Sequence, residues 1–156
     1  MYANLESKVG IVTGASRGIG SAIAKAMANV GASVVVNYLS GRSKAKDVVS
    51  AIHQAGGHAL SVQGDVSKVA DSRHIVDAAF SSFGRIDCLV NNSGIYHFAP
   101  LESITEDDFH RQFNVNVLGF RKRILRRSSI TSFTSRANLD DAPRQGRDAP
   151  RIDLQS

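Results

Sequence analysis

The stretch Thr13-Gly14-Ala15-Ser16-Arg17-Gly18-Ile19-Gly20 decides the fold, because it joins a short apolar run to a longer amphipathic one. The run before it, from Val9 to Thr13, predicts a buried strand. From Gly20 to Val30 apolar residues recur at helical spacing, and Gly31 follows as a helix-ending residue. Glycines at such a junction permit a tight turn and a close approach of the backbone to phosphates. The stretch therefore predicts a strand, a phosphate-binding turn and a helix.

Short apolar runs and longer amphipathic runs continue to alternate beyond this turn. The expected strands are Ser33 to Asn37, Ala59 to Gln63 and Ile86 to Val90. The expected helices are Ser43 to Ala55 and Ser67 to Phe83. A capping pattern of Thr105 and Asp108 opens a further helix that runs through Val117. This alternation predicts an α/β fold with right-handed βαβ units and a parallel sheet covered on both faces.

The composition is that of a globular protein of a reducing compartment. Of the 156 residues, 42% are hydrophobic and 21% are charged, as in ordinary globular domains. No apolar run approaches the roughly 18 residues of a membrane span, and Met1 to Lys8 lacks the layout of a signal peptide. Cys88 is the only cysteine, which excludes an internal disulfide. We therefore expect a cytoplasmic protein without a membrane partner.

The net positive charge belongs to the C-terminal part of the chain. Residues 1–119 carry ten Lys/Arg and ten Asp/Glu, whereas residues 120–156 carry nine Lys/Arg and four Asp/Glu, which accounts for the net charge of +5. An Arg-rich stretch at 121–127 precedes a Ser/Thr-rich run, and residues 136–156 contain no aromatic residue. This composition is typical of disorder. We expect an ordered half-domain over residues 1–120 and a basic tail, disordered or non-native, over residues 121–156.

Four motifs in this order resemble those of the short-chain dehydrogenase/reductase family. The turn has that family's T-G-x-x-x-G-x-G spacing rather than the more common G-x-G-x-x-G. Asp65-Val66 ends the third strand, where the family places an Asp that contacts adenine, and Asn91-Asn92-Ser93-Gly94 is similar to the family's N-N-A-G. The segment from Asn114 to Gly119 is similar to its helical N-x-x-G. The resemblance covers roughly residues 5–120 and implies an NAD(P)-dependent oxidoreductase of small-molecule carbonyls or alcohols.

The resemblance also implies a Rossmann-type, doubly wound parallel sheet of strand order 3-2-1-4, truncated after the fourth strand and the helix that follows it. The residues expected to contact the cofactor are Gly14, Ser16, Arg17, Gly18, Ile19, Gly20, Asn37, Arg42, Asp65, Val66, Asn91, Asn92, Ser93 and Gly94. The family match gives Asn116 a catalytic role, which is to hold a water molecule in a proton relay. No metal site is expected, because the histidines show no ligand spacing. The alternative is a glycine-rich turn that binds nothing.

Charges near the second expected strand favour NADP over NAD. NAD enzymes usually offer a carboxylate to the ribose 2′-hydroxyl about 20 residues beyond the glycines. Here Asn37 ends the second strand, and no acidic residue occurs between Glu6 and Asp47. The guanidinium groups of Arg17 and Arg42 can hold a 2′-phosphate, which a carboxylate would repel. We expect NADP, with NAD the less favoured cofactor; Arg42 could equally be an exposed charge at the start of a helix.

Other catalytic groups that the resemblance implies have no counterpart in this chain. In the family, a Ser and a Tyr-x-x-x-Lys pair beyond the Asn segment assist hydride transfer. The tyrosines here are Tyr2, Tyr38 and Tyr96. All of them precede Asn116, and Lys122 is the only lysine beyond Lys68. We therefore expect a catalytically inactive chain, whose abrupt change near Phe120 is typical of an altered reading frame or exon.

The tail leaves further alternatives open. Its Arg-rich stretch at 121–127 could bind nucleic acid or an anionic surface, but no aromatic residues interleave its basic ones. Nucleic acid is therefore the less favoured partner. Ser128 to Ser132 is superficially similar to the family's serine strand, although no apolar strand precedes it. A non-functional truncated product is the third alternative, and an exposed edge at the fourth strand would impair stability and oligomerisation.

Overall fold

The computed structural model of the chain describes residues 4–95, 100–118 and 131–134. The strands are β1 Val9–Val12, β2 Ser33–Tyr38, β3 His58–Gln63, β4 Cys88–Asn91 and β5 Thr131–Thr134. The helices are α1 Gly18–Asn29, α2 Arg42–Gln54, α3 Val69–Phe83 and α4 Glu106–Phe113, with the short 3-10 helix η1 Leu101–Ser103 and the π-helix η2 Asn114–Leu118. Every strand and helix that the alternation predicts is present.

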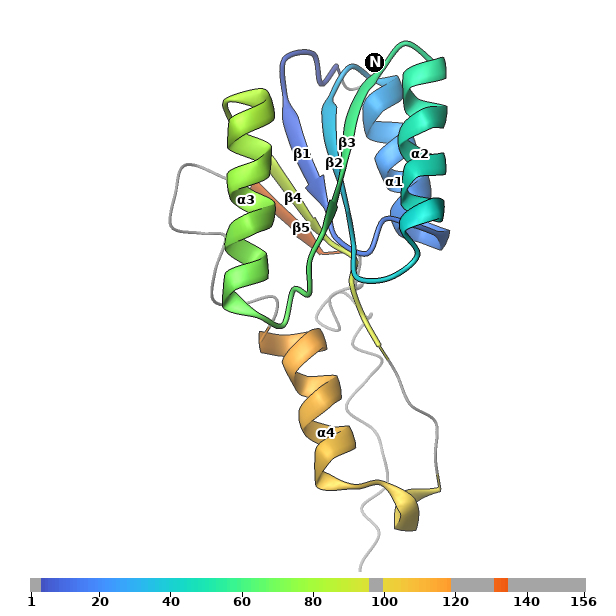
Figure 1. Ribbon diagram of the computed structural model, residues 1–156, viewed down its shortest axis with the longest axis vertical. Coiled ribbons are helices and arrows are strands. Elements are labelled where there is room, and N and C mark those ends of the chain that lie inside the picture. Colours follow the sequence, from blue (N-terminus) through green and yellow to red (C-terminus); the bar gives the residue numbers. More distant parts are fainter. Residues whose placement is uncertain (1–3, 96–99, 119–130, 135–156) are drawn as a thin grey trace, which may run out of the picture.

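The sheet is parallel and has the order β3-β2-β1-β4-β5. The helices α1 and α2 cover one face and α3 covers the other (Figure 1). This arrangement confirms the predicted doubly wound α/β fold and the predicted order of the first four strands.

The prediction that β4 forms an edge of the sheet is wrong. Thr131–Thr134 pairs in parallel with β4, from Cys88 opposite Thr131 to Asn91 opposite Thr134. The Ser/Thr-rich segment lacks an apolar run, so its pattern does not predict a strand, yet an open strand edge offers backbone groups to any chain that can pair with them. The sheet therefore continues beyond the fourth strand. The rest of the predicted tail, including the Arg-rich stretch, lies outside the described residues.

Two apolar layers hold the helices to the sheet. On the side of α1 and α2 the layer includes Val12, Val34, Val36, Ala24 and Ile52. On the side of α3 it includes Ile11, Val35, Val62, Ile75 and Leu89. Neighbouring residues of one strand enter opposite layers, which explains why the central strands are continuously apolar. Burial of each large aliphatic side chain contributes about 1.5–3 kcal/mol, and the layers fix the strand ends that carry the site.

The helix α4 extends away from the sheet (Figure 1). It begins with the predicted capping box, in which Thr105 Oγ1 accepts from the Asp108 backbone at 3.2 Å and Asp108 Oδ2 accepts from the Thr105 backbone at 3.2 Å. The α-helix ends at Phe113 rather than at Val117, because the next five residues form the π-helix η2. Neither α4 nor any other described helix combines the length and apolar character that a membrane crossing requires.

Asp87 forms hydrogen bonds and ion pairs at the amino-terminal end of the sheet, beside the first residue of β1. Its Oδ2 accepts from the Val9 amide at 2.9 Å and from Arg85 Nε at 2.8 Å, and its Oδ1 lies 3.6 Å from Lys8 Nζ. Partial burial opposes the charged form, but the hydrogen bonds of Arg85 and Val9 and the two positive charges outweigh it, so the pKa of Asp87 lies below its usual value.

The lowered pKa of Asp87 predicts a loss of stability in acid. Because the folded state holds the carboxylate form, its stabilising contribution is complete above the unfolded-state pKa of about 3.9 and is lost as the pH falls through the lower folded-state pKa. We expect Asp87→Asn to lower the free energy of urea unfolding at pH 7 and to reduce the dependence of this free energy on pH below about 3.9. The control is Asp47→Asn, at an exposed position of α2. An acid dependence equal in wild type and Asp87→Asn would contradict this role.

Candidate functional site

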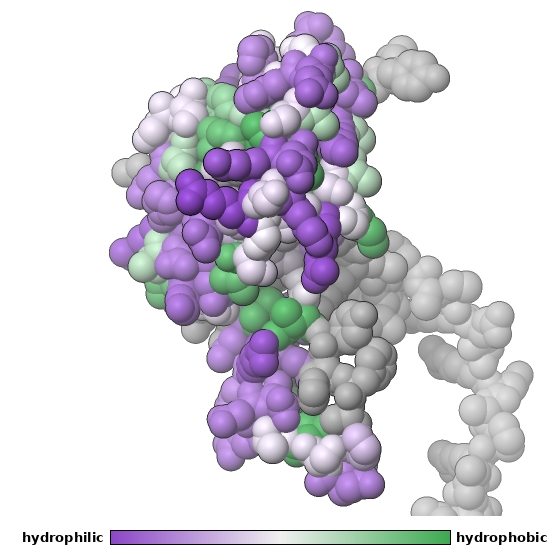
Figure 2. Space-filling model, turned by 45° about the vertical axis from the view of Figure 1, so that its right-hand side comes forward, coloured by the Kyte–Doolittle hydropathy of each residue, from purple (hydrophilic) through white to green (hydrophobic). Residues whose placement is uncertain are grey.

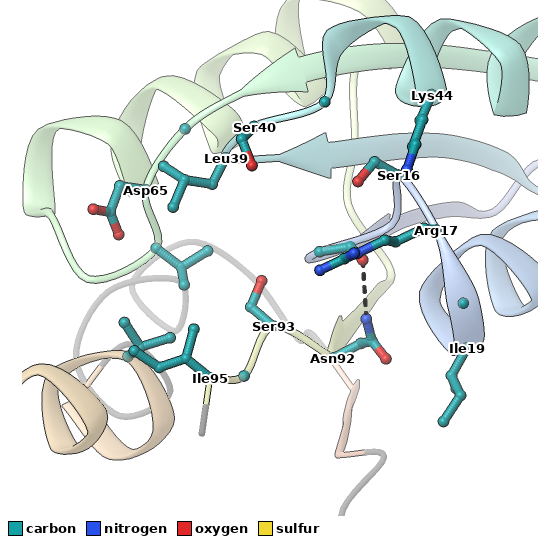
Figure 3. A pocket seen from close by; sticks show the side chains of 17 residues that line it. Ser16, Arg17, Ile19, Leu39, Ser40, Lys44, Asp65, Asn92, Ser93 and Ile95 are labelled. Carbon is teal, nitrogen blue, oxygen red and sulfur yellow. Dashed lines mark hydrogen bonds between the residues drawn. The ribbon is translucent and has the colours of Figure 1, made fainter. Parts of the chain in front are cut away.

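A cavity of about 570 Å³ opens at the carboxyl ends of β1, β2, β3 and β4. Its size is typical of small-molecule sites. Ten of the predicted contact residues line it: Gly14, Ser16, Arg17, Gly18, Ile19, Asp65, Val66, Asn92, Ser93 and Gly94. They come from three segments that are far apart in the sequence and meet because parallel strands end at the same edge of a sheet (Figure 3). On the surface, hydrophobic residues gather where the body of the molecule meets the part that carries α4 (Figure 2).

The glycine turn presents backbone amides to this cavity. Gly14 and Gly18 have φ values of +61° and +57°, a left-handed conformation that favours glycine. The helix α1 begins at Gly18 with no side-chain cap and no acidic residue in its first turn. Its first N–H groups are therefore free to bind an anion, with the helix dipole in their favour.

Asn92 braces this turn from the end of β4. Its Nδ2 donates to the backbone oxygens of Thr13 and Gly14, at 3.0 and 3.2 Å. Figure 3 shows the bond to Gly14. Thr13 Oγ1 in turn accepts from the backbone amides of Asn92 and Ser93, each at 3.0 Å. The two loops are thus locked together beside the cavity. Thr13 was not among the predicted site residues, although its place directly after the strand offers a clue.

Five predicted residues do not line the cavity: Gly20, Asn37, Arg42, Asn91 and Asn116. Gly20 lies beneath the turn, where an added Cβ would stand 2.7 Å from the Gly14 oxygen. Asn91 is the last residue of β4. Arg42 is the exposed first residue of α2.

Asn37 supports the turn from below instead of facing a ligand. The residue is 1% exposed. Its Oδ1 accepts from the Gly14 amide at 3.3 Å, and its Nδ2 donates to the Val62 and Gly64 oxygens at 3.3 and 3.1 Å. A polar side chain in a sheet covered on both faces must find its partners inside the protein, and Asn37 finds them on two neighbouring segments.

Residues just beyond β2 reach the cavity in place of Asn37 and Arg42. The strand runs one residue further than predicted, to Tyr38, and Leu39, Ser40 and Gly41 follow it along the cavity wall. Lys44, in the first turn of α2, also lines the cavity. Figure 3 shows Lys44 and Arg17 on the same side of the cavity as Ser16, with Asp65 on the opposite side. Lys44 was not among the residues predicted from the sequence to contact the cofactor.

Asn116 ties η2 to the loop that follows β4. Its Oδ1 accepts from the Ile95 amide at 3.0 Å and its Nδ2 donates to the Ile95 oxygen at 2.7 Å. Its neighbour Val115 lines the cavity together with Ile95. The side-chain amide is thus engaged at both ends in positioning the cavity wall, and its predicted role of holding a water molecule stays a prediction.

Other reactive groups lie away from this cavity. Within residues 4–95, 100–118 and 131–134, no cluster of His, Cys, Asp and Glu could hold a metal ion. Burial and then the charge of Asp87 raise the pKa of the Cys88 thiol, which does not line the cavity. The described residues of the cavity therefore offer amides, hydroxyls, two cations and the Asp65 carboxylate rather than a metal centre or a nucleophilic thiol.

Comparisons with known proteins match this chain over its first three quarters. The family profile described as short chain dehydrogenase matches residues 8–124. An uncharacterized oxidoreductase of Methylorubrum extorquens is 57% identical over 117 residues, which make up 75% of this chain and 47% of the relative. Elsinochrome reductase 1 of Elsinoe fawcettii is 45% identical over 117 residues, or 75% of this chain and 44% of the relative.

The solved structures that resemble this chain are also short-chain dehydrogenases or reductases. A short chain dehydrogenase from Burkholderia cenocepacia, in complex with NADP, has a TM-score of 0.72 at 40% identity and is matched over 75% of this chain and 48% of its own. A dehydrogenase/reductase from Sinorhizobium meliloti has a TM-score of 0.73 at 40% identity, over 74% and 46%. The chain thus spans about half the length of the relatives it matches. By its sequence and its fold, it belongs to the short-chain dehydrogenase/reductase family.

Proposed function

We propose that this chain is the cofactor-binding portion of a short-chain dehydrogenase/reductase and that its cavity binds NADP(H). The observation that carries the proposal is the uncapped start of α1, whose glycine turn opens into a cavity at the ends of four parallel strands. Free N–H groups at a helix start are suited to a pyrophosphate. The relative from Burkholderia cenocepacia, described as a complex with NADP, supports the same ligand.

The residues of the cavity fit a dinucleotide. A Cβ added to Gly18 would meet no atom within 4 Å, so open space for phosphates lies beside the turn. Leu39 and Val66 offer apolar contacts for an adenine ring, and Asp65 offers it an acceptor. Gly94 and Ile95 would accompany the nicotinamide end, which supplies or accepts hydride when bound.

The preference for NADP follows from the charges that line the cavity. Arg17 and Lys44 are its two cations, and Asp65 is the only carboxylate among the described residues that line it. Asp65 Oδ1 already accepts from the amide and hydroxyl of Ser67, at 2.9 and 2.6 Å. Because the Asn37 side chain is buried, the lack of a carboxylate at that position does not distinguish the two cofactors. Leu39, Ser40 and Gly41 line the cavity after β2, and the lack of a carboxylate among them favours NADP.

We also propose that this chain is catalytically inactive. No Tyr-x-x-x-Lys occurs in the sequence, and Tyr38 is buried at 5% exposure. The substrates would be small carbonyls or alcohols in full-length relatives, several of which are named reductases. The division at residue 120 and the cytoplasmic location belong to the same proposal. Impaired oligomerisation does not, because β5 covers the edge of β4 from which it was predicted.

Isothermal titration of the full chain with NADP⁺ and NAD⁺ tests this function. We expect NADP⁺ to bind, with an affinity that falls as salt screens the phosphate contacts. We expect NADPH consumption with a panel of carbonyl compounds to stay at the level of buffer. A matched titration with single-stranded RNA should give no heat. A chain that binds RNA but not NADP⁺ would overturn the proposal, and robust turnover would overturn its inactive part.

A further inference from the structure

A second cavity lies at the opposite end of the sheet from the cavity described above. It has a volume of about 690 Å³ and opens where β2 and β3 begin and where α1 and α2 end. Its walls come from the N-terminal segment, from residues 28–32 and from residues 55–58. The two cavities share no lining residue, so a ligand here would be independent of the nucleotide.

The charge that lines this second cavity is negative. Among the described residues that line it, Glu6 is the only Asp, Glu, Lys or Arg, and His58 is the only histidine. Within the described parts of the chain Glu6 forms no ion pair, since the acidic partners of the ion pairs there are Asp87 and Glu106. A chain with a net charge of +5 thus presents a carboxylate without a cationic neighbour at this place.

The ends of α1 and α2 add negative potential to the same cavity. The two helices lie side by side on one face of the sheet (Figure 1), and a Cβ added to Gly57, just beyond α2, would stand 3.3 Å from Ala28 Cβ of α1. The last turn of α1 contains no basic residue, and that of α2 contains only His53, whose Nε2 lies 2.9 Å from the Ala59 oxygen. Because the carboxyl end of a helix carries a partial negative charge, both helix ends favour a cation.

The backbone of the N-terminal segment fixes Glu6 against the end of α1. The Leu5 amide donates to the Val30 oxygen at 2.8 Å, and the Glu6 amide donates to Asn4 Oδ1 at 2.8 Å. A Cβ added to Gly31 would stand 2.9 Å from Glu6 Cγ, so this side chain lies directly beside the turn that ends α1. A carboxylate is unfavourable at the carboxyl end of a helix, and a bound cation would relieve that repulsion.

We propose that this cavity binds an alkylammonium group, carried by a polyamine or by a lysine side chain. The ammonium group lies between the Glu6 carboxylate and the ends of α1 and α2, because its three N–H donors need oxygen acceptors and no acceptor of its own must be satisfied. The small residues Gly31, Ala55 and Gly56 leave the backbone of the helix ends open to it. The volume is that of a small-molecule site, which leaves room for the alkyl chain.

Titration of the full chain with spermidine tests this site, and the amide chemical shifts of Gly31, Gly56 and Gly57 locate it. We expect spermidine to move these signals, and Glu6→Gln to weaken its binding about tenfold. Glu102→Gln is the matched control, because Glu102 is exposed and lines neither cavity. NADP⁺ binding should be equal in wild type and Glu6→Gln.

A lysine introduced at the edge of the cavity should take the place of the ligand. Ala55 is exposed at the end of α2 and lines the cavity, whereas Ala22 is exposed on α1 and does not line it. We expect Ala55→Lys to raise the free energy of urea unfolding at low salt, because its ammonium group compensates the helix ends. The same variant should weaken spermidine binding about tenfold, and Ala22→Lys should leave this binding unchanged.

A second probe, N-acetyl-lysine amide, distinguishes the two sources of the ammonium group. If it binds as tightly as spermidine, the site accepts lysine side chains; if it binds more weakly or not at all, the ligand is a polyamine. Wild type that binds neither probe would overturn the inference. An equal loss of spermidine binding in Glu6→Gln and Glu102→Gln would also overturn it, because the attraction would then be general rather than local.

Discussion

Gly20→Ala is expected to lower the free energy of unfolding by roughly 3 kcal/mol and to abolish NADP⁺ binding. An added Cβ would lie 2.7 Å from the Gly14 oxygen, 3.0 Å from Ala15 Cα and in overlap with Asn92 Nδ2. These neighbours cannot yield easily, because Asn92 Nδ2 is bonded to the Thr13 and Gly14 oxygens. Helix propensity alone predicts the opposite sign, since alanine is favoured over glycine in helices by about 1 kcal/mol.

Urea unfolding and titration with NADP⁺ check this expectation. The matched control is Gly84→Ala, because Gly84 has φ +75° at the end of α3 and an added Cβ there meets no atom within 4 Å. It should cost about 1 kcal/mol through backbone strain alone and leave cofactor binding intact. If Gly20→Ala were no less stable than Gly84→Ala, close packing of the turn would not be the reason for this glycine.

The fold could be predicted from the sequence because its determinants are local. The strand Val9–Val12 has no polar side chain, and Ser33–Tyr38 contains three successive valines, as expected for strands covered on both faces. The helices end at glycines such as Gly31 and Gly84, both with positive φ. The phosphate-binding turn depends on three glycines whose spacing is visible directly, and residues 14 and 16–19 of this turn line the cavity.

The details of the site depend on where each element ends, which the pattern does not resolve. Because β2 extends through Tyr38, Asn37 lies within the strand and is buried, and the loop that meets the cavity begins at Leu39. The same shift separates Arg42 from Lys44: two residues on one helix turn differ by about 200° in direction. The strand β5 could not be predicted for another reason, since its pairing depends on the open backbone edge of β4 rather than on its own side chains.

Asn37→Asp is expected to lower the free energy of unfolding by roughly 3 kcal/mol at pH 7. The asparagine Nδ2 donates to the Val62 and Gly64 oxygens, at 3.3 and 3.1 Å. A carboxylate has no proton to donate, so a negative oxygen would face two carbonyl oxygens in a position that is 1% exposed. The substitution replaces the side-chain nitrogen by an oxygen of nearly equal size. Its effect is therefore electrostatic rather than steric.

The dependence on pH makes this prediction specific. Burial and the facing carbonyls disfavour the charged form, so the folded-state pKa of the introduced carboxyl should lie above the unfolded value of about 3.9. The stability deficit is then complete above the folded-state pKa and shrinks as the pH falls toward 3.9, because the protonated acid can donate to one carbonyl. Asn37→Leu loses all three side-chain hydrogen bonds and should be destabilised without this recovery. Urea unfolding of both variants and wild type, compared from neutral to acidic pH, measures the difference. The opposite outcome is a stability deficit of Asn37→Asp, relative to wild type, that grows as the pH falls. It would show that the introduced carboxylate is solvated and that Asn37 does not hold the turn in place.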